Sequence, residues 1–149
     1  NMLFNNKDIV SEIDNQKISE PSDLIGKNIF PFLYIPNETS KAMTYICFEM
    51  FTTRNLGNTM LRDELHFYIF SHQDHMLDKY SYTRVDVLQS LIAKQLNGSG
   101  KFGIGDLELQ RSTAFDVDLH HRGKELIFSV VAQNQGGDQI NGQSTNWKR

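Results

Sequence analysis

Two neighbouring stretches of sequence, MTYICFEMFTTR at residues 43–54 and LRDELHFYIF at residues 61–70, decide the fold. The first is dense in aromatic and β-branched side chains, which pack well on a half-buried pleated sheet. In the second, apolar and polar positions alternate with the period of two that a strand requires. Its core-facing set is Leu61, Leu65, Phe67 and Ile69, and its opposite set is Arg62, Glu64, His66 and Tyr68. Residues 55–58 are short enough to join the two strands as an antiparallel hairpin.

The spacing of apolar residues after this hairpin predicts one main helix, from Ser81 to Leu96. Val85, Leu88, Ile92 and Leu96 recur at helical intervals. Ser81 is a candidate N-cap, and Gly98 follows the last apolar position, as is common at helix ends. We therefore expect this helix to pack on one face of the sheet.

The N-terminal residues predict a helical extension over residues 1–28. Its apolar residues fit a short N-terminal helix between residues 3 and 18, with Asn6 as a possible cap. A first strand is predicted at residues 32–35. Because Pro31 and Pro36 bracket it, and proline cannot donate a ladder hydrogen bond, this strand should be short or lie at a sheet edge.

Beyond the helix, four glycines fall within residues 98–105, a density that predicts a loop. This loop follows a helix and precedes a strand, whereas a phosphate-binding loop has the opposite order. We interpret it as a candidate docking loop. Its residues are Gly98, Gly100, Lys101, Phe102 and Gly103.

Two further strands are predicted, at residues 106–113, with a possible continuation through Phe115 and Val117, and at residues 124–134. A turn at residues 120–123 separates them. The second has a near-continuous apolar run, which is typical of a central strand covered on both faces. The polar residues 135–149 bury too little to order themselves, so we predict a disordered tail.

These elements predict an α+β fold, with an antiparallel or mixed β-sheet, one main helix packed on a face and a short N-terminal helix. Residues 29–134 form the single α+β domain of this prediction. A chain of 149 residues suits one domain, since a fold of this size buries about 68–70% of its unfolded surface.

Composition argues against several classes of protein. The net charge of −3 gives no basic excess for binding nucleic-acid phosphates. With a single cysteine, Cys47, neither a disulfide within the chain nor a paired-cysteine metal site is expected. The sequence has no apolar segment of membrane-spanning length and no secretory leader, so we expect a soluble, intracellular product. Asn1, which precedes Met2, resembles a residue left by a cloning tag.

The histidines are the residues that suggest an enzyme, because zinc hydrolysis needs three ligands around one point. His66 and His72 share a strand face but are about 20 Å apart along it. His75 lies in a polar segment, and His120 and His121 lie in a predicted turn. Ser112 and Ser129 lack the motif of a nucleophile. We therefore expect no catalytic site, no cofactor and no bound metal.

The polar face of the second strand has two interpretations of similar weight. Arg62, Glu64, His66 and Tyr68 could form a solvated face, or they could form a subunit interface, where Arg and Tyr are enriched.

Several segments together resemble the small neck proteins of tailed bacteriophages, the tail terminator and head–tail connector group. The segments are FLYIP at residues 32–36, TYICFE at 44–49, FYIFSHQD at 67–74, TRVDVL at 83–88 and LIF at 126–128. The match covers residues 30–134 and leaves out the N-terminal stretch and the tail.

This resemblance implies a structural subunit of the virion neck, assembled in the host cytoplasm. Such subunits form a homo-oligomeric ring, often hexameric, that terminates the tail tube or joins tail to head. The implied partners are the tail tube protein and a head-completion or connector protein, with DNA only as cargo in the channel and no membrane. The alternatives are a monomeric phage accessory module that binds one protein, and a histidine-dependent metallohydrolase.

Overall fold

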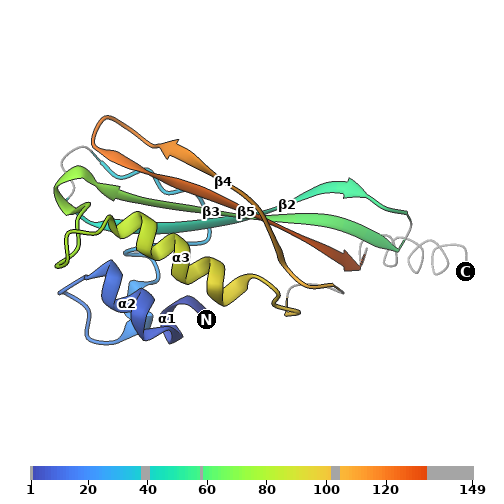
Figure 1. Cartoon of the computed structure of the whole chain (residues 1–149), viewed down its shortest axis with the longest axis horizontal. Coiled ribbons are helices and arrows are strands. Elements are labelled where there is room, and N and C mark those ends of the chain that lie inside the picture. The colour runs from blue at the N-terminus through green and yellow to red at the C-terminus, as the bar shows by residue number, and fades with distance from the viewer. Residues whose placement is uncertain (1, 38–40, 58, 102–104, 134–149) are drawn as a thin grey trace, which may run out of the picture.

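The computed structural model describes residues 2–37, 41–57, 59–101 and 105–133, and its elements form an α+β fold. In chain order these elements are α1 (Met2–Asn5), α2 (Lys7–Ile13), the 3-10 turn η1 (Pro21–Leu24), β1 (Ile29–Phe30), β2 (Thr44–Asn55), β3 (Met60–His72), the 3-10 turn η2 (Gln73–His75), α3 (Arg84–Leu96), β4 (Glu108–Asp116) and β5 (His121–Gln133). The strands form one sheet in the order β1-β2-β3-β5-β4. β1 runs parallel to β2 and the other pairs are antiparallel. Figure 1 shows the helices on one face of the sheet, which confirms the predicted mixed sheet with a helical cover.

The predicted hairpin is confirmed as β2 and β3. Ile46 lies opposite Ile69, and Phe48 lies opposite Phe67. Ile46, Phe67 and Ile69 are buried together with Leu126 and Phe128 of β5 in the core beneath the helices. Because apolar side chains alternate along each strand, one face supplies this core.

The opposite face of the sheet has a second, aromatic core, which the period of two did not predict. Tyr45, Tyr68 and Phe70 are buried there with Phe30. The rings of Phe30 and Tyr34 stack with centroids 4.2 Å apart, and those of Tyr45 and Phe70 lie 5.3 Å apart. Tyr68 is therefore a core residue and not part of a uniformly wet face.

The predicted strand at residues 32–35 is wrong, because the strand ends at Phe30. Pro31 follows and has no N–H to donate to the sheet. The chain then crosses the aromatic face, where the Leu33 N–H donates to Glu49 Oε1 at 3.0 Å and the Tyr34 N–H lies 3.4 Å from Cys47 Sγ. This crossing covers the aromatic core.

Helix α3 buries the predicted stripe of Val85, Leu88, Ile92 and Leu96 but begins later than predicted. Ser81 is not the N-cap: its φ of 65° is left-handed, and Thr83 occupies the cap position. The C-terminal prediction is confirmed, since Gly98 has a φ of 79° and its N–H donates to the Leu107 oxygen at 2.7 Å.

The N-terminal segment packs into the same core as α3. Leu3, Ile9, Ile13 and Leu24 are buried there. Asn6 caps α2 as predicted, because its side-chain oxygen accepts from the N–H groups of Asp8 and Ile9 at 3.0 and 3.3 Å.

β5 is longer than predicted, beginning at His121, and the turn before it lies at residues 117–120. Residues 126–128 are all buried, so the prediction of a central strand covered on both faces is confirmed. Gly123 allows β5 to approach β3 closely, because a Cβ at this position would lie 1.8 Å from the Ile69 oxygen. Among the described residues, no helix has the length and apolar character needed to cross a membrane.

Candidate interaction surfaces

The sheet extends well past the helices, and we call this extension the arm. It consists of residues 50–57 and 60–63 with the end of β5 at residues 131–133. Figure 1 shows β2, β3 and β5 continuing beyond the C-terminal end of α3. A shift of register between Thr52 and Arg54 marks a bulge in β2, a feature that increases local twist.

Apolar side chains of the arm are exposed on both faces and at its tip. Met50 and Phe51 project from β2, and Leu56 and Met60 flank the tip of the hairpin. Leu56 is 40% exposed and Met60 is 36% exposed. A run of exposed apolar residues on a projecting sheet is typical of an interaction surface.

A groove lies at the base of the arm, on the face that carries the helices. Its volume is about 640 Å³, and its lining includes Ile25, Phe48 and Leu96. All but two of the lining residues are apolar, and the exceptions are Glu49 and Lys101. This size and lining are typical of ligand or side-chain binding sites.

The predicted interface residues contact one another and their neighbours on the aromatic face. His66 Nδ1 lies 2.7 Å from Glu125 Oε1, and its Nε2 lies 2.8 Å from Glu64 Oε2. Arg62 is exposed and donates to Ser129 Oγ at 3.3 Å.

Tyr68, the fourth predicted interface residue, is buried beside Phe115, with ring centroids 5.0 Å apart. Burial raises the pKa of its hydroxyl, and the negative charge of Glu125 raises it further. Arg62, at the other end of this set, is the residue most open to a partner.

The candidate docking loop begins as an ordered turn. The N–H of Leu107 donates to the Ser99 oxygen at 2.8 Å, which closes the loop near Gly98 and Gly100. Lys101 is exposed and lines the groove. Phe102 and Gly103 lie outside the described residues, as does the predicted tail at residues 135–149.

His72 meets the adjacent pair His120 and His121, which are distant from it in sequence, at one end of the sheet. The ring of His72 lies 5.8 Å from that of His120 and 5.1 Å from that of His121. The pairing of β3 with β5 places His72 opposite His121, a contact that sequence spacing did not predict. Within the described ranges, no group of three or more His, Cys, Asp or Glu side chains has a metal-binding arrangement.

His121 is buried and its Nδ1 lies 2.9 Å from Asp118 Oδ2. Desolvation by burial raises the pKa of the Asp118 carboxyl. Hydrogen bonds from the backbone N–H of His120 and from His121 outweigh this effect and lower the pKa overall. The carboxylate therefore orders the turn that leads into β5.

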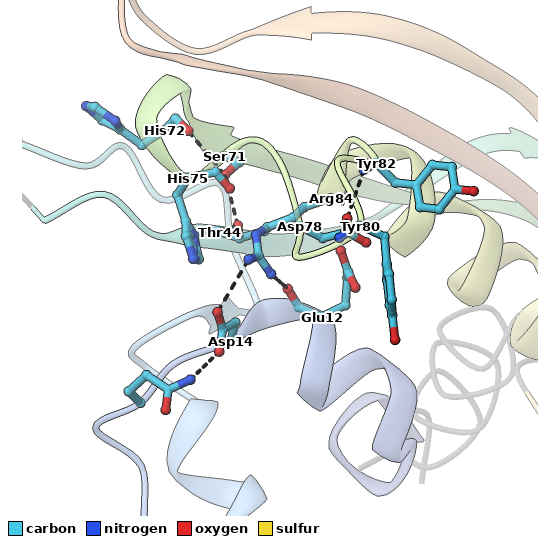
Figure 2. Close-up of polar contacts among 11 residues, drawn as sticks. Glu12, Asp14, Thr44, Ser71, His72, His75, Asp78, Tyr80, Tyr82 and Arg84 are labelled. Atoms are coloured by element: carbon cyan, nitrogen blue, oxygen red, sulfur yellow. Dashed lines mark hydrogen bonds and ion pairs between the residues drawn. The ribbon is translucent and has the colours of Figure 1, made fainter.

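The sequence also did not predict the exposed loop at residues 77–83, which we call the tyrosine loop. Tyr80 is 68% exposed and Tyr82 is 64% exposed, and Leu77 is also exposed. Figure 2 shows both rings pointing away from Arg84. Rigid, exposed tyrosines are enriched where proteins bind other proteins.

Asp78 holds the tyrosine loop in its shape. Its Oδ1 accepts from the N–H groups of Tyr80 and Tyr82, each at 2.8 Å, and its own N–H donates to the Tyr82 oxygen. An Asp that accepts from the backbone two residues later forms an Asx turn. An Asp two residues before Tyr80 is thus a sequence signal for a turn at this position. The prediction of Ser81 as an N-cap did not take this signal into account.

Arg84 anchors the base of the tyrosine loop to α2, as Figure 2 shows. Its guanidinium donates to the backbone oxygen of Glu12 at 2.7 Å and lies 3.3 Å from Asp14 Oδ2. Nearby, Thr44 Oγ1 and Ser71 Oγ lie 2.9 Å apart. The loop is therefore held at its base by Arg84 and internally by the hydrogen bonds of Asp78.

Comparison with known proteins connects the chain to a family. A family model described as YomW matches residues 1–130, which include the groove and most of the arm. No curated protein and no solved structure matches the chain.

Proposed function

We propose, from the premise that this chain belongs to the YomW family, that it is a virion protein which forms a ring at the neck of a tailed phage. The family name is of the kind given to proteins of a Bacillus phage region, which indicates a phage-associated protein. The proposed subunit ends the tail tube or joins the tail to the head. Its role is structural, without catalysis or a cofactor.

The observation that carries this proposal is the arm. An uncovered sheet with exposed apolar side chains is a liability in water, and natural proteins cover such surfaces or keep them short. Here Phe51, Leu56 and Met60 are exposed on a hairpin that none of the described helices covers. A second copy of the chain is the partner that would be present whenever the protein is made, and it would bury these side chains.

Open strand edges give further support to self-association. In the part of the chain that the structure describes, β4 pairs with β5 alone, so no strand pairs with its outer edge. On the opposite side of the sheet, β1 pairs with Ile46 and Cys47 of β2, and among the described residues no strand pairs with β2 along the outer edge of the arm. Contacts between different surfaces of neighbouring copies generate a ring when the rotation closes.

The charge of the chain suits a channel that DNA crosses without binding. With a net charge of −3, the subunit lacks the basic excess that would hold phosphates by counterion release. In the proposed ring, the loop that contains Gly98 and Lys101 contacts the tail tube protein or the head-completion protein.

The test of this proposal is the oligomeric state, followed by phage assembly. Light scattering at several concentrations should give a discrete mass several times that of the monomer. A phage that lacks the gene should make heads and tails that do not join, or tails of uncontrolled length. A monomer at all concentrations, or normally joined virions in micrographs of the mutant, would contradict the proposal.

The tyrosine loop favours a second candidate function, that of a monomeric phage accessory module. A loop braced by Asp78 and Arg84 presents Tyr80 and Tyr82 without the entropic cost of ordering them on binding. In this candidate function the arm does not self-associate, and the tyrosine loop binds one virion or host protein. Light scattering separates the two candidates, because the module stays monomeric.

A further inference from the structure

We propose that the tip of the arm of one copy inserts into the groove of the next copy in the ring. This inference rests on the proposed ring and names the two surfaces that build it. The tip consists of the exposed side chains of Leu56 and Met60. The groove is the one lined by Ile25, Phe48 and Leu96, with Glu49 and Lys101 at its polar positions.

The first argument is the match between the two surfaces. The tip presents two large aliphatic side chains at the end of a narrow hairpin. The groove has a volume of about 640 Å³ and an apolar lining, to which the exposed side chains of Ile25 and Met50 contribute. A protruding apolar tip and an apolar groove on the same chain are two different surfaces that can meet in a contact between copies.

The second argument is that the tip of a copy does not reach the groove of the same copy. Met50 lines the groove and Leu56 lies six residues further along the hairpin, a distance of about 20 Å on an extended strand. Along this length β3 is paired with β2 on one side and with β5 on the other. This pairing holds the arm as an extended sheet. The tip therefore points away from its own groove and must enter that of a neighbour.

The third argument is that this contact is heterologous. Each copy offers one tip and one groove, so copies add in one direction and close as a ring when the angle between them permits. A contact of this kind uses two different surfaces of the described chain, the tip of the hairpin and the groove at the base of the arm.

Charge is compatible with the insertion. Arg54 is exposed beside the tip, and Glu49 lies at the groove. Lys101 lies at the groove as well, and Asp63 is half-buried on the arm, where it accepts from Thr52 Oγ1 at 2.9 Å. The arm thus carries two positive side chains, with Arg62 as the second, and one negative side chain, and the groove carries one of each sign, so a positive charge of the arm can face Glu49.

The test is disulfide trapping between copies. The double variant M60C/I25C places one thiol at the tip and one in the groove. Cys47 is left in place, because it is buried and burial raises its pKa to about 11. Mild oxidation should give a ladder of linked subunits on a non-reducing gel, up to the mass that light scattering gives for the unmodified ring.

The matched control is the double variant M60C/L119C. Leu119 is highly exposed, but it lies in the turn between β4 and β5 and does not line the groove. This variant should give no ladder. A second variant, M60D, should raise the concentration at which the ring dissociates by about tenfold or more, with the thermal unfolding of the monomer unchanged.

The outcomes separate this inference from the proposed function. A stable ring in solution that gives no ladder with M60C/I25C, and that survives M60D, would overturn the contact between tip and groove but keep the ring. A chain that stays monomeric at every concentration would overturn both. A ladder with M60C/I25C and none with M60C/L119C would support both.

Discussion

Arg84, the first residue of α3, donates a hydrogen bond from its guanidinium to the backbone oxygen of Glu12, in the last turn of α2, at 2.7 Å. The two residues are 72 positions apart in sequence. The same guanidinium lies 3.3 Å from Asp14 Oδ2, just beyond the end of α2. This contact fixes the N-terminal segment against the main helix and holds the tyrosine loop at its base.

Replacement of Arg84 by alanine should lower the free energy of unfolding by about 2 kcal/mol, because it removes a buried guanidinium that pairs with the partly exposed Asp14 and leaves the Glu12 oxygen without its donor. Urea unfolding at fixed protein concentration measures the change. The control is Arg122→Ala, whose side chain is 74% exposed, and it should change stability by less than about 0.5 kcal/mol. Equal effects of the two variants on the free energy of unfolding would show that the Arg84 contact does not stabilise the fold.

Replacement of Glu12 by glutamine should raise stability at neutral pH. Burial raises the pKa of the Glu12 carboxyl above its ordinary value of 4.5, and the negative charge of Asp78 raises it further. With a raised pKa in the folded state, the stability that this group contributes is complete below pH 4.5 and is lost as the pH rises through the folded pKa. The advantage of Glu12→Gln should therefore shrink as the pH is lowered to 4.5. A pH-independent difference would contradict the burial of this carboxyl.

His75 should make the protein less stable in mild acid. Burial lowers the pKa of its imidazole below 6.5, and the positive charge of Arg84 lowers it further. With a lowered pKa in the folded state, the contribution of this group is present above pH 6.5 and is lost as the pH falls through the folded pKa. His75→Gln should flatten the dependence of melting temperature on pH below 6.5. The effect should be larger than that of His120→Gln, a control substitution at an exposed position.

The thiol of Cys47 should resist alkylation in the native protein. It is fully buried, and burial raises its pKa to about 11, so little thiolate is present at pH 8. Mass spectrometry after treatment with iodoacetamide should show unmodified native protein and complete modification in denaturant. Rapid modification of the folded protein would show that β2 opens in solution.

Replacement of Leu88 by alanine should destabilise the fold by about 2–5 kcal/mol, the cost of a cavity in a packed core. Leu88 is fully buried between α3 and the sheet. Tyr82→Ala, at an exposed position of the tyrosine loop, is the control and should be close to neutral for stability. If Leu88→Ala left stability unchanged but dissociated an oligomer, the stripe on α3 would face a neighbouring copy.

The sequence alone determined the elements whose signals are local. The alternation of apolar residues specified the hairpin of β2 and β3, and the spacing of Val85, Leu88, Ile92 and Leu96 specified the buried face of α3. Asn6 and Gly98 marked helix ends correctly, because a cap depends on a few neighbouring residues. Ser81 misled the prediction of the helix start, since the turn formed by Asp78 competes for the same backbone.

The tertiary structure decided everything that depends on contacts between distant residues. The crossing of residues 31–34 packs Leu33 and Tyr34 against the second core, and the pairing of β3 with β5 brings His72 to His121. Likewise, the groove combines residues from α1, β2 and α3. A periodic pattern shows which face of an element is apolar, but not which distant surface covers that face. That choice is made by packing and strand pairing across the whole chain, and for this reason the arm and the groove became visible only in the folded structure.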